Sequence, residues 1–272
     1  MIAEPGADSE FAALTSKISR ERGFGCASYK EKCLRRRIAV RMRATGAHSY
    51  EQYSRVLDRD LREYDRLLDA LTINVTKLFR NWETYATLAT TVIPALWALP
   101  GEIVVWSAGC SSGEEPYSLA VLFHRHAEKV GELQRLTRVR IIGTDIARDS
   151  LAAAERGVYP EAAFADTPAD IRERYFSDTF PAQVSPAVRS LVSFERRDLL
   201  SGAPPAPAVH LITCRNVIIY FDRETQERLF VTFSNLLPPD GYLLLGKVET
   251  LLGDARTRFV SIRGRERIFR RA

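Results

Sequence analysis

The residues best suited to chemistry lie in a short turn at 109–113, between an apolar run and an amphipathic segment. The turn begins with Gly109, is rich in small residues, and is followed directly by Glu114, Glu115 and Pro116. Small residues let backbone N–H groups approach a ligand, and the start of a helix leaves N–H donors unpaired. Two carboxylates here would repel a phosphate, so the pattern predicts a nucleotide-type site for a ligand with a cationic or hydroxyl-rich group. An ordinary capped strand–helix turn is the alternative.

Further polar positions follow two other predicted strands. The second strand ends at Asp145, and an acid at this place in a Rossmann-like sheet hydrogen-bonds ribose hydroxyls. Its carboxylate could instead cap a helix that begins near Ala147, and the two roles are compatible. Asn216 and Val217 follow the strand at 208–214, at the end where open α/β sheets bind ligands.

A connector at 71–81 alternates polar and apolar residues, just before the helix at 83–98 that leads to the first strand. If it folds over a ligand, it supplies hydrogen bonds from Asn74, Thr76 and Arg80. A plain interdomain linker is the alternative.

The elements that must position these residues change type along the chain. Amphipathic helices are predicted at 9–20, 29–44, 49–58 and 60–72. Beyond residue 103, strands are predicted at 103–109, 139–145, 208–214, 242–247, 258–263 and 266–271, with helices between the first of them. Residues 157–190 break this alternation, and the stretch 189–195 is assigned with them to an inserted β-hairpin. We therefore expect an all-α N-terminal domain at 1–80, which recognises a partner, and an α/β, Rossmann-like domain at 81–272 with a small inserted β-subdomain at about 157–190.

The net charge of +5 belongs to the N-terminal domain. Residues 1–80 contain 16 Lys/Arg and 11 Asp/Glu, and the remaining residues balance. The main basic patch is the helix at 29–44, whose charges flank an apolar stripe of Leu34, Ile38 and Met42. The candidate binding residues are Arg35, Arg36, Arg37, Arg41 and Arg43. They predict an acidic partner, either a protein surface or nucleic acid; solvated charges on an amphipathic helix are the alternative.

Three other signals concern where the protein works. Apolar runs are shorter than the ~18–20 residues that a membrane span needs, and the first residues lack the apolar core of a signal peptide. The four cysteines have no metal-ligand spacing, and the four histidines show no ligand or triad spacing. We expect a cytoplasmic protein with reduced thiols and no metal site.

Three stretches together resemble the signatures of the CheR-type chemotaxis receptor methyltransferases. They are residues 105–118, 71–80 and 214–222, and the similarity spans nearly the whole chain in the family's order. The resemblance implies a methyltransferase that uses S-adenosylmethionine, yields S-adenosylhomocysteine, and methylates glutamate side chains of chemoreceptors. It also implies a helical N-terminal domain joined to a Rossmann-like domain that carries a small β-subdomain.

The resemblance assigns roles by motif position. The implied cofactor contacts are Asn74, Thr76, Arg80, Gly109, Glu114, Glu115, Asp145, Asp198, Leu199, Asn216 and Val217. Tyr220 would lie beside the transferred methyl group, and with Arg80 it is the expected catalytic residue; an aromatic packed behind the strand is the alternative for Tyr220. The arginines of the helix at 29–44 would bind the acidic helical bundle of a receptor's cytoplasmic part.

The implied chemistry agrees with the residues present. The acceptor glutamate is already a carboxylate near neutral pH, with a reference pKa of about 4.3, so transfer needs no general base. In-line transfer from a sulfonium depends on positioning, which can supply roughly 7–11 kcal/mol.

The chain departs from the family pattern in two places. Members that bind a receptor's C-terminal pentapeptide have a Gly-x-Gly loop in the β-subdomain, but residues 177–186 contain none, so we expect a pentapeptide-independent enzyme. Residues 82–124 also contain no Lys or Arg, so a catalytic role for a basic residue there does not transfer. Two other hypotheses stay open, an RNA methyltransferase and a non-catalytic cofactor-sensing adaptor. We favour a monomer that binds receptors and not nucleic acid, without inserting into the membrane.

Overall fold

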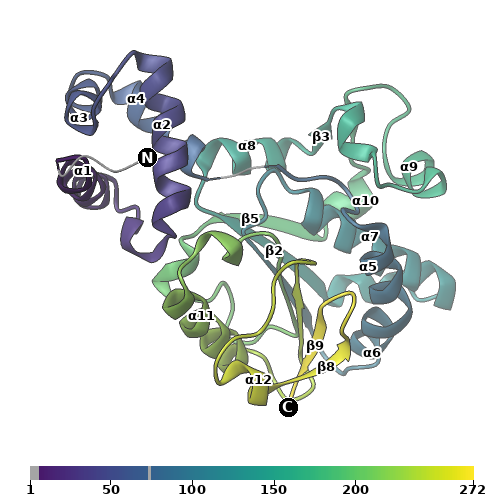
Figure 1. The fold of residues 1–272 in the computed structure, drawn as a ribbon. Helices are drawn as coiled ribbons and strands as arrows, with labels where there is room; N and C mark the ends of the chain where they lie inside the picture. The colour runs from purple at the N-terminus through teal and green to yellow at the C-terminus, as the bar shows by residue number, and fades with distance from the viewer. Residues whose placement is uncertain (1–5, 73–74) are drawn as a thin grey trace. The chain divides into compact units, whose positions relative to one another are not determined.

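The structure is a computed structural model that describes residues 6–72 and 75–272, and it packs as two compact units (Figure 1). The helical unit contains residues up to 73 together with 220–225. The sheet unit contains residues 74–219 and 226–272. Every helix within the described ranges is too short or too polar to cross a lipid bilayer.

The helical unit is built from amphipathic helices, as the sequence predicts. They are α1 (Ala7–Arg22), α2 (Glu31–Thr45), α3 (Tyr50–Arg59) and α4 (Leu61–Leu71), with a 3₁₀ turn, η1 (Cys26–Ser28). Gly23 and Gly46 end α1 and α2 in left-handed conformations, and the side chains of Ser49 and Asp60 cap the next two helices. The predicted helices are confirmed, with ends shifted by up to two residues.

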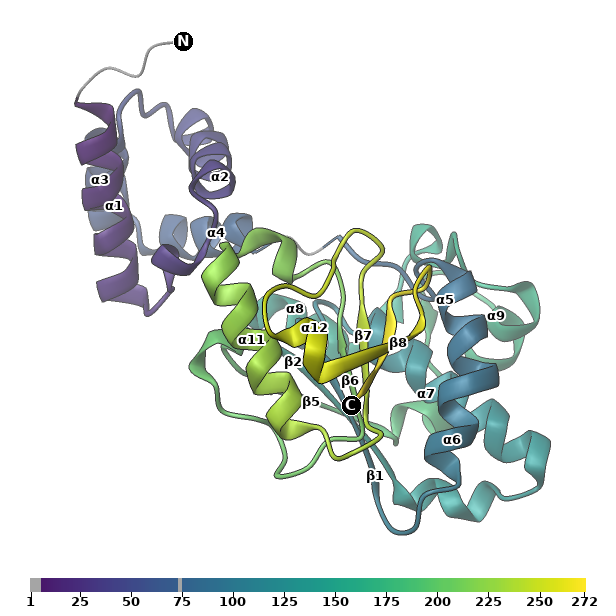
Figure 2. The same ribbon diagram turned by 60° about the horizontal axis from the view of Figure 1, so that its bottom comes forward.

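A seven-stranded sheet forms the centre of the sheet unit (Figures 1 and 2). Its strands are β1 (Ile103–Ala108), β2 (Val139–Asp145), β5 (Val192–Arg196), β6 (Leu211–Cys214), β7 (Tyr242–Leu245), β8 (Phe259–Arg263) and β9 (Ile268–Arg271). Their order is β5-β2-β1-β6-β7-β9-β8, in which the first five strands are parallel and β9 runs antiparallel to β7 and to β8. This is the α/β, Rossmann-like architecture that the alternating pattern predicts.

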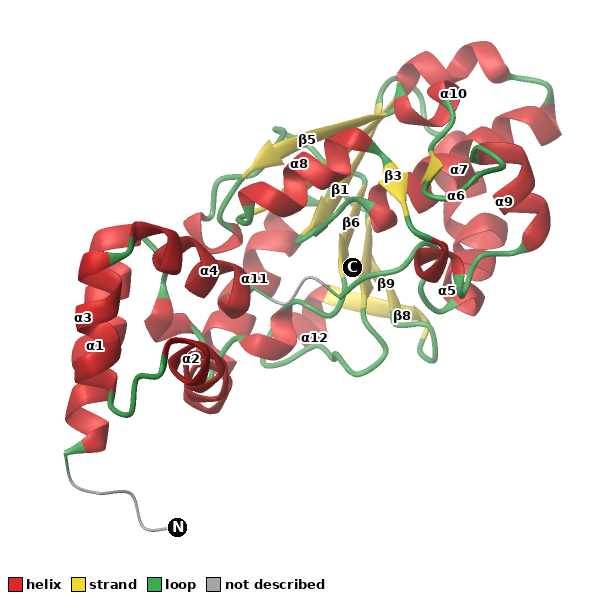
Figure 3. Cartoon of the chain, turned by 90° about the horizontal axis from the view of Figure 1, so that it is seen from above, coloured by secondary structure: helices red, strands yellow, loops and turns green. Residues whose placement is uncertain are grey.

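Helices cover both faces of this sheet because its central strands are apolar on both sides (Figure 3). The helices of this unit include α7 (Glu114–Val130), α8 (Arg148–Arg156), α11 (Arg223–Leu236, from residue 226 onward) and α12 (Ala255–Arg258), with 3₁₀ turns η3 (Leu133–Arg138), η5 (Leu199–Ser201) and η6 (Ile218–Tyr220, up to residue 219). Ile103 and Val105 of β1 join the core cluster that contains α7. Trp106 points to the other face, where its ring packs edge-on against Phe233 of α11 at 5.7 Å between centroids.

The helix expected at 83–98 is not continuous. It consists of α5 (Trp82–Thr87), a π-helical turn η2 (Leu88–Val92) and α6 (Ile93–Trp97). Pro94 lacks the N–H that a regular α-helix would donate to the preceding turn, and the wider π turn falls just before it.

The insertion after α8 contains a short antiparallel pair. Its elements are β3 (Val158–Tyr159), η4 (Glu161–Phe164), α9 (Ala169–Tyr175), β4 (Ala182–Gln183) and α10 (Pro186–Arg189), with β3 paired to β4. The assignment of 189–195 to this insertion is wrong, because β5 pairs in parallel with β2 at the edge of the main sheet. An edge strand needs no continuous apolar run, and β5 is half-exposed along its length.

Candidate functional site

The candidate site lies at the carboxyl edge of the sheet, where four parallel strands end in register. Ala108 of β1 pairs with Thr144 of β2, and Cys214 of β6 pairs with Leu245 of β7. The segments that follow these strands therefore lie side by side, as expected of the binding edge of an open α/β sheet. They include the turn at 109–113.

The turn after β1 packs closely against the segment after β6. Gly109 has a φ of +79°, and a Cβ atom there would lie 2.6 Å from Cγ2 of Val217. The N–H groups of Gly109 and Cys110 donate to the carbonyl of Thr144, so the turn is also held to β2. Only glycine satisfies both the left-handed conformation and the close contact at position 109.

Asp145 is buried at the end of β2, and both of its carboxylate oxygens accept backbone N–H groups. Ser111 N–H donates to Oδ2 at 2.8 Å and Ala147 N–H donates to Oδ1 at 2.9 Å. Burial raises the pKa of Asp145, and these backbone donors act against that rise. The carboxylate thus joins the turn at 109–113 to the segment before α8, and it keeps lone pairs for a ligand hydroxyl.

Asp198 and Leu199 follow β5, the strand next to β2. The N–H of Arg197 donates to the carbonyl of Asp145 at 2.9 Å, which extends the β2–β5 pairing to the ends of both strands. Oδ1 of Asp198 accepts the N–H of Leu200 and so caps η5. The structure therefore brings Asp145, Asp198 and Leu199 together at one part of the edge.

The carboxylate of Glu114 is buried and has few hydrogen-bond donors around it. Its oxygens accept from Oγ of Ser112 at 2.8 and 3.0 Å, and among the described residues no Lys or Arg forms an ion pair with it. Burial raises the pKa of Glu114 to about 7, against the lowering effect of the Ser112 hydrogen bond. A site that leaves a carboxylate in this state suits a cationic ligand group.

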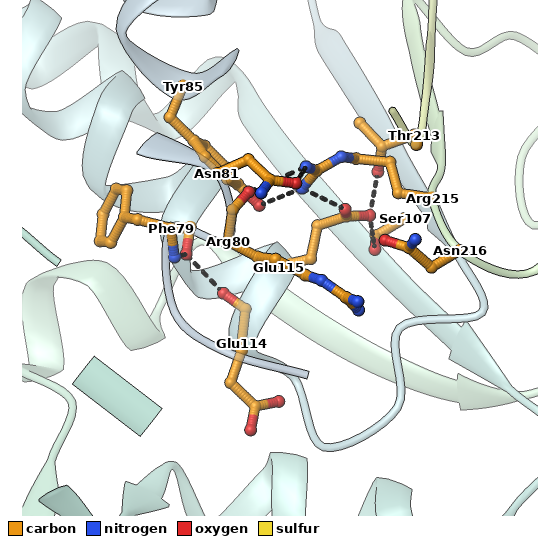
Figure 4. A network of polar contacts seen from close by, with 12 residues as sticks. Phe79, Arg80, Asn81, Tyr85, Ser107, Glu114, Glu115, Thr213, Arg215 and Asn216 are labelled. Carbon is orange, nitrogen blue, oxygen red and sulfur yellow. Dashed lines mark hydrogen bonds and ion pairs between the residues drawn. The ribbon is translucent and has the colours of Figure 1, made fainter. Parts of the chain in front are cut away.

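The adjacent Glu115 lies in a closed network of protein donors (Figure 4). Ser107 of β1 and Thr213 of β6 donate to its Oε1 at 2.8 and 2.5 Å, and Arg215 lies 3.5 Å from its Oε2. The carboxylate therefore links α7 to two neighbouring strands. The structure separates it from Glu114, which points the other way in the same view.

Arg215 connects this network to the connector that precedes α5. Its Nη2 donates to the carbonyl of Arg80 at 2.8 Å and lies 3.3 Å from Oδ1 of Asn81, while Nη1 donates to the hydroxyl of Tyr85 at 3.2 Å. The N–H of Phe79 donates to Oγ of Ser118 on α7. The backbone around Arg80 is thereby fixed at the site edge, an anchor that the sequence analysis did not predict.

The predicted ligands of the connector are only partly defined. The Arg80 side chain is half-exposed, and its Nη1 donates to the carbonyl of Val75 at 3.0 Å. Thr76 is also half-exposed. Asn74 lies outside the described residues.

A further buried carboxylate at the site is Glu249, which was not predicted from the sequence. It accepts the N–H groups of Gly246 at 2.6 Å, Asn216 at 2.9 Å and Val217 at 3.0 Å. Burial raises the pKa of Glu249, and its backbone N–H donors act against that rise. Asn216 has a φ of +60°, and Glu249 holds this turn to the end of β7. An acid four residues beyond an apolar strand is the only sequence signal for this role.

The helical unit holds Tyr220 against α2. The carbonyl of Tyr220 accepts the N–H of Lys30 at 2.8 Å, and the guanidinium of Arg37 lies 5.4 Å from the centroid of the Tyr220 ring. Arg37 also donates to the carbonyl of Ala70, and burial lowers the pKa of Arg37. The structure therefore brings an expected catalytic residue together with an expected substrate-binding arginine.

The other arginines of α2 divide into two kinds. Arg35 pairs with Asp8 and Glu31 and lies 4.0 Å over the ring of Phe11. Arg41 forms a two-pronged ion pair with the buried Glu63. These two side chains hold helices of the unit together, whereas the remaining pair, Arg36 and Arg43, is exposed.

Comparison with known proteins identifies the family. Residues 9–72 match the domain described as "CheR methyltransferase, all-alpha domain", and residues 74–268 match "CheR methyltransferase, SAM binding domain". The chain belongs to the CheR methyltransferase family. It is therefore an S-adenosylmethionine-dependent methyltransferase of the chemotaxis protein methyltransferase family, as the three motifs predict.

Individual CheR relatives align over most of the chain. The chemotaxis protein methyltransferase of Klebsiella aerogenes is 33% identical over 254 residues, covering 90% of this chain and 84% of that protein. The chemotaxis protein methyltransferase of Borreliella burgdorferi is 29% identical over 264 residues, covering 92% and 91%. An uncharacterized 104.1 kDa protein of Rhodobacter capsulatus is 36% identical over 229 residues, which are 82% of this chain but 24% of that protein.

The residues at the sheet edge of this CheR protein fit S-adenosylmethionine. The Glu114 carboxylate lacks a cationic partner among the described residues, and the cofactor carries an ammonium group. The buried Oγ of Ser111 has no hydrogen-bond partner in the described part of the chain, and a polar ligand would supply one. Asp145 retains acceptor capacity for ribose hydroxyls.

Proposed function

We propose that this chain transfers the methyl group of S-adenosylmethionine to glutamate side-chain carboxylates of chemoreceptors, forming glutamate methyl esters for sensory adaptation. The observation that carries the proposal is Arg80. Its backbone is fixed at the sheet edge by Arg215, and among the described residues no acid pairs with its guanidinium. A cation held at the cofactor-binding edge suits an anionic acceptor.

In the proposed reaction the cofactor supplies a methyl group bonded to a sulfonium. A carboxylate oxygen of the acceptor forms the new bond to carbon as the sulfur–carbon bond breaks, and S-adenosylhomocysteine leaves. Glu114 would bind the cofactor's ammonium group and Asp145 its ribose. The turns carrying Gly109 and Val217 would bind its remaining polar groups. Arg80 and Tyr220 orient the acceptor, which enters already ionised and requires no base.

Receptor recognition belongs to the helical N-terminal domain, residues 1–80 in our assignment. Arg36 and Arg43 are exposed and available to the acidic helices of a receptor. Arg37 extends this face toward Tyr220. Arg35 and Arg41 contribute through their ion pairs, which hold the face in shape. The protein would act in the cytoplasm as a monomer, without nucleic acid.

The direct test is transfer of labelled methyl groups from S-adenosylmethionine to purified cytoplasmic fragments of chemoreceptors from the same organism. We expect base-labile label on receptor glutamates. The Tyr220→Phe and Arg80→Ala variants should transfer the methyl group slowly. Unlabelled receptors together with labelled RNA would replace the proposal with an RNA methyltransferase. Intact signalling by both variants despite lost transfer would instead support an adaptor.

The insertion leads to a second proposal, independence from a receptor pentapeptide. Its segment at 177–186 lacks the Gly-x-Gly loop of pentapeptide-binding relatives. We expect receptors with and without a C-terminal pentapeptide to be methylated at equal rates. Tight binding of the isolated pentapeptide in calorimetry would contradict this.

A further inference from the structure

The second domain has no net charge because an acidic segment and a basic segment balance each other. Residues 81–240 contain 15 Lys/Arg and 20 Asp/Glu, whereas residues 241–272 contain eight Lys/Arg and three Asp/Glu. One of those three acids, Glu249, is buried and bound to backbone N–H groups. The last two strands and the loops beside them therefore carry a strong positive charge on the sheet unit itself.

The sheet topology places part of this charge at the cofactor-binding edge. Because β9 is antiparallel to both β7 and β8, the turn between β8 and β9 lies level with the carboxyl end of β7. The N–H of Leu245, the last residue of β7, donates to the carbonyl of Arg267 in that turn at 3.1 Å. The arginines of the turn are thus on the same edge as Gly246 and Asn216.

Four cations form what we call the basic rim: Lys247, Arg263, Arg265 and Arg267. Arg263, Arg265 and Lys247 are exposed, and Nε of Arg267 donates to the carbonyl of Lys247 at 3.3 Å. Nζ of Lys247 lies 3.5 Å from a carboxylate oxygen of Glu83 in the first turn of α5. This contact brings the rim to the segment that carries Arg80, three residues before Glu83.

We propose that the basic rim docks an acidic helical segment of the receptor that flanks the methyl-accepting glutamate. This inference rests on the proposed function, because it requires a receptor glutamate to reach the same edge. Carboxylates beside the acceptor would then meet exposed guanidinium groups, whose planar donors suit bidentate contacts. Val248 follows Lys247 and is 73% exposed, so it offers an apolar contact to a helix face.

The composition of the rim favours a protein partner over a phosphate-rich one. Glu83 and Glu266 lie among its cations and would oppose the dense charge of a nucleic acid or an anionic membrane. An acidic helix presents separated carboxylates together with apolar side chains, which matches mixed charge beside an exposed valine.

The test compares two charge reversals of equal size in the full-length chain. Arg263→Glu with Arg265→Glu changes the rim. Arg256→Glu with Arg258→Glu changes exposed arginines before β8, at the opposite, amino edge of the sheet. Methyl transfer is measured against receptor-fragment concentration at several salt concentrations, and cofactor binding is measured separately by calorimetry.

We expect the rim variant to raise the KM for receptor about 5- to 30-fold at low salt, with less effect at high salt and unchanged cofactor affinity. The control variant should stay within about twofold of the wild type. Equal KM values for the two variants would overturn the inference while leaving the proposed function intact, provided that the wild type methylates the fragment. A wild type that methylates no receptor would overturn both. Loss of binding to RNA or to phosphatidylglycerol vesicles by the rim variant, at an unchanged receptor KM, would assign the rim to a phosphate partner instead.

Discussion

Protonation of Glu114 should control cofactor binding near neutral pH. Burial raises the pKa of Glu114 to about 7, compared with 4.5 for an exposed glutamate. The cofactor's ammonium group requires the ionised form, which makes up about 3% of the population at pH 5.5 and about 90% at pH 8. Cofactor affinity should therefore rise about 30-fold between these pH values, and binding at pH 6.5 should release a large fraction of one proton.

The same shift predicts an opposite effect on the ligand-free protein. The unfolded chain releases the Glu114 proton above pH 4.5, whereas the folded protein keeps it up to about pH 7. The contribution of this neutral carboxyl group to the free energy of unfolding is therefore complete below pH 4.5 and is lost as pH rises through 7. At about 1.36 kcal/mol per unit, the loss is about 3 kcal/mol. Glu114→Gln should remove this pH dependence and leave the protein more stable than the wild type at pH 8.

Calorimetry with S-adenosylhomocysteine between pH 5.5 and 8, in two buffers of different ionisation heat, measures both affinity and proton release. Glu114→Gln should bind weakly at every pH in this range, and Glu161→Gln, an exposed acid in the insertion, should behave like the wild type. An affinity of the wild type that is constant from pH 5.5 to 8 would refute the assignment of Glu114 to the ammonium group.

Three further substitutions test the anchors of the site. Gly109→Ala forces a left-handed alanine against Val217, so we expect a loss of roughly 1–3 kcal/mol in urea unfolding and weaker cofactor binding; unchanged stability would show that the turn relaxes freely. Glu249→Gln leaves at least one of three backbone N–H groups without an acceptor, at about 1–3 kcal/mol, and a cofactor affinity equal to that of the wild type would disprove its positioning role. Arg215→Lys cannot reproduce the planar set of donors, so methyl transfer should fall about 10- to 100-fold in a folded protein, and full activity would show that Arg80 needs no such anchor.

Local sequence signals predicted the parts of the site that are formed by neighbouring residues. The glycine-rich turn, the start of α7 and the acid at the end of β2 are each encoded within a few residues, and all of them occupy the positions expected. Periodicity also predicted the helices of the N-terminal unit and all strands of the main sheet except β5. That strand escaped because it is a half-exposed edge strand, without the continuous apolar run that a central parallel strand needs.

The roles of Glu115, Arg215 and Glu249 as anchors could not be predicted from the sequence, because they depend on contacts between residues that are distant in the chain. Thr213 and Arg215 meet Glu115 across about a hundred positions, and Glu249 meets Asn216 across 33. Nothing in the local composition around Glu249 distinguishes a buried acceptor of N–H groups from a surface acid. Such contacts appear only when the strand order brings the ends of β6 and β7 together.

Glu114 and Glu115 show why a motif does not assign roles to its own residues. Both are acids in the first turn of α7, and the motif predicts that both contact the cofactor. Successive residues of a helix point about 100° apart, so when α7 packs on the sheet one side chain must turn toward β1 and β6 while the other faces the turn at 109–113. Protein hydroxyls and Arg215 then occupy the carboxylate of Glu115, whereas Glu114 keeps a raised pKa and an unpaired charge. Of two chemically identical neighbours, the fold therefore leaves Glu114 without a cationic partner among the described residues and uses Glu115 to hold the strands and the helix together.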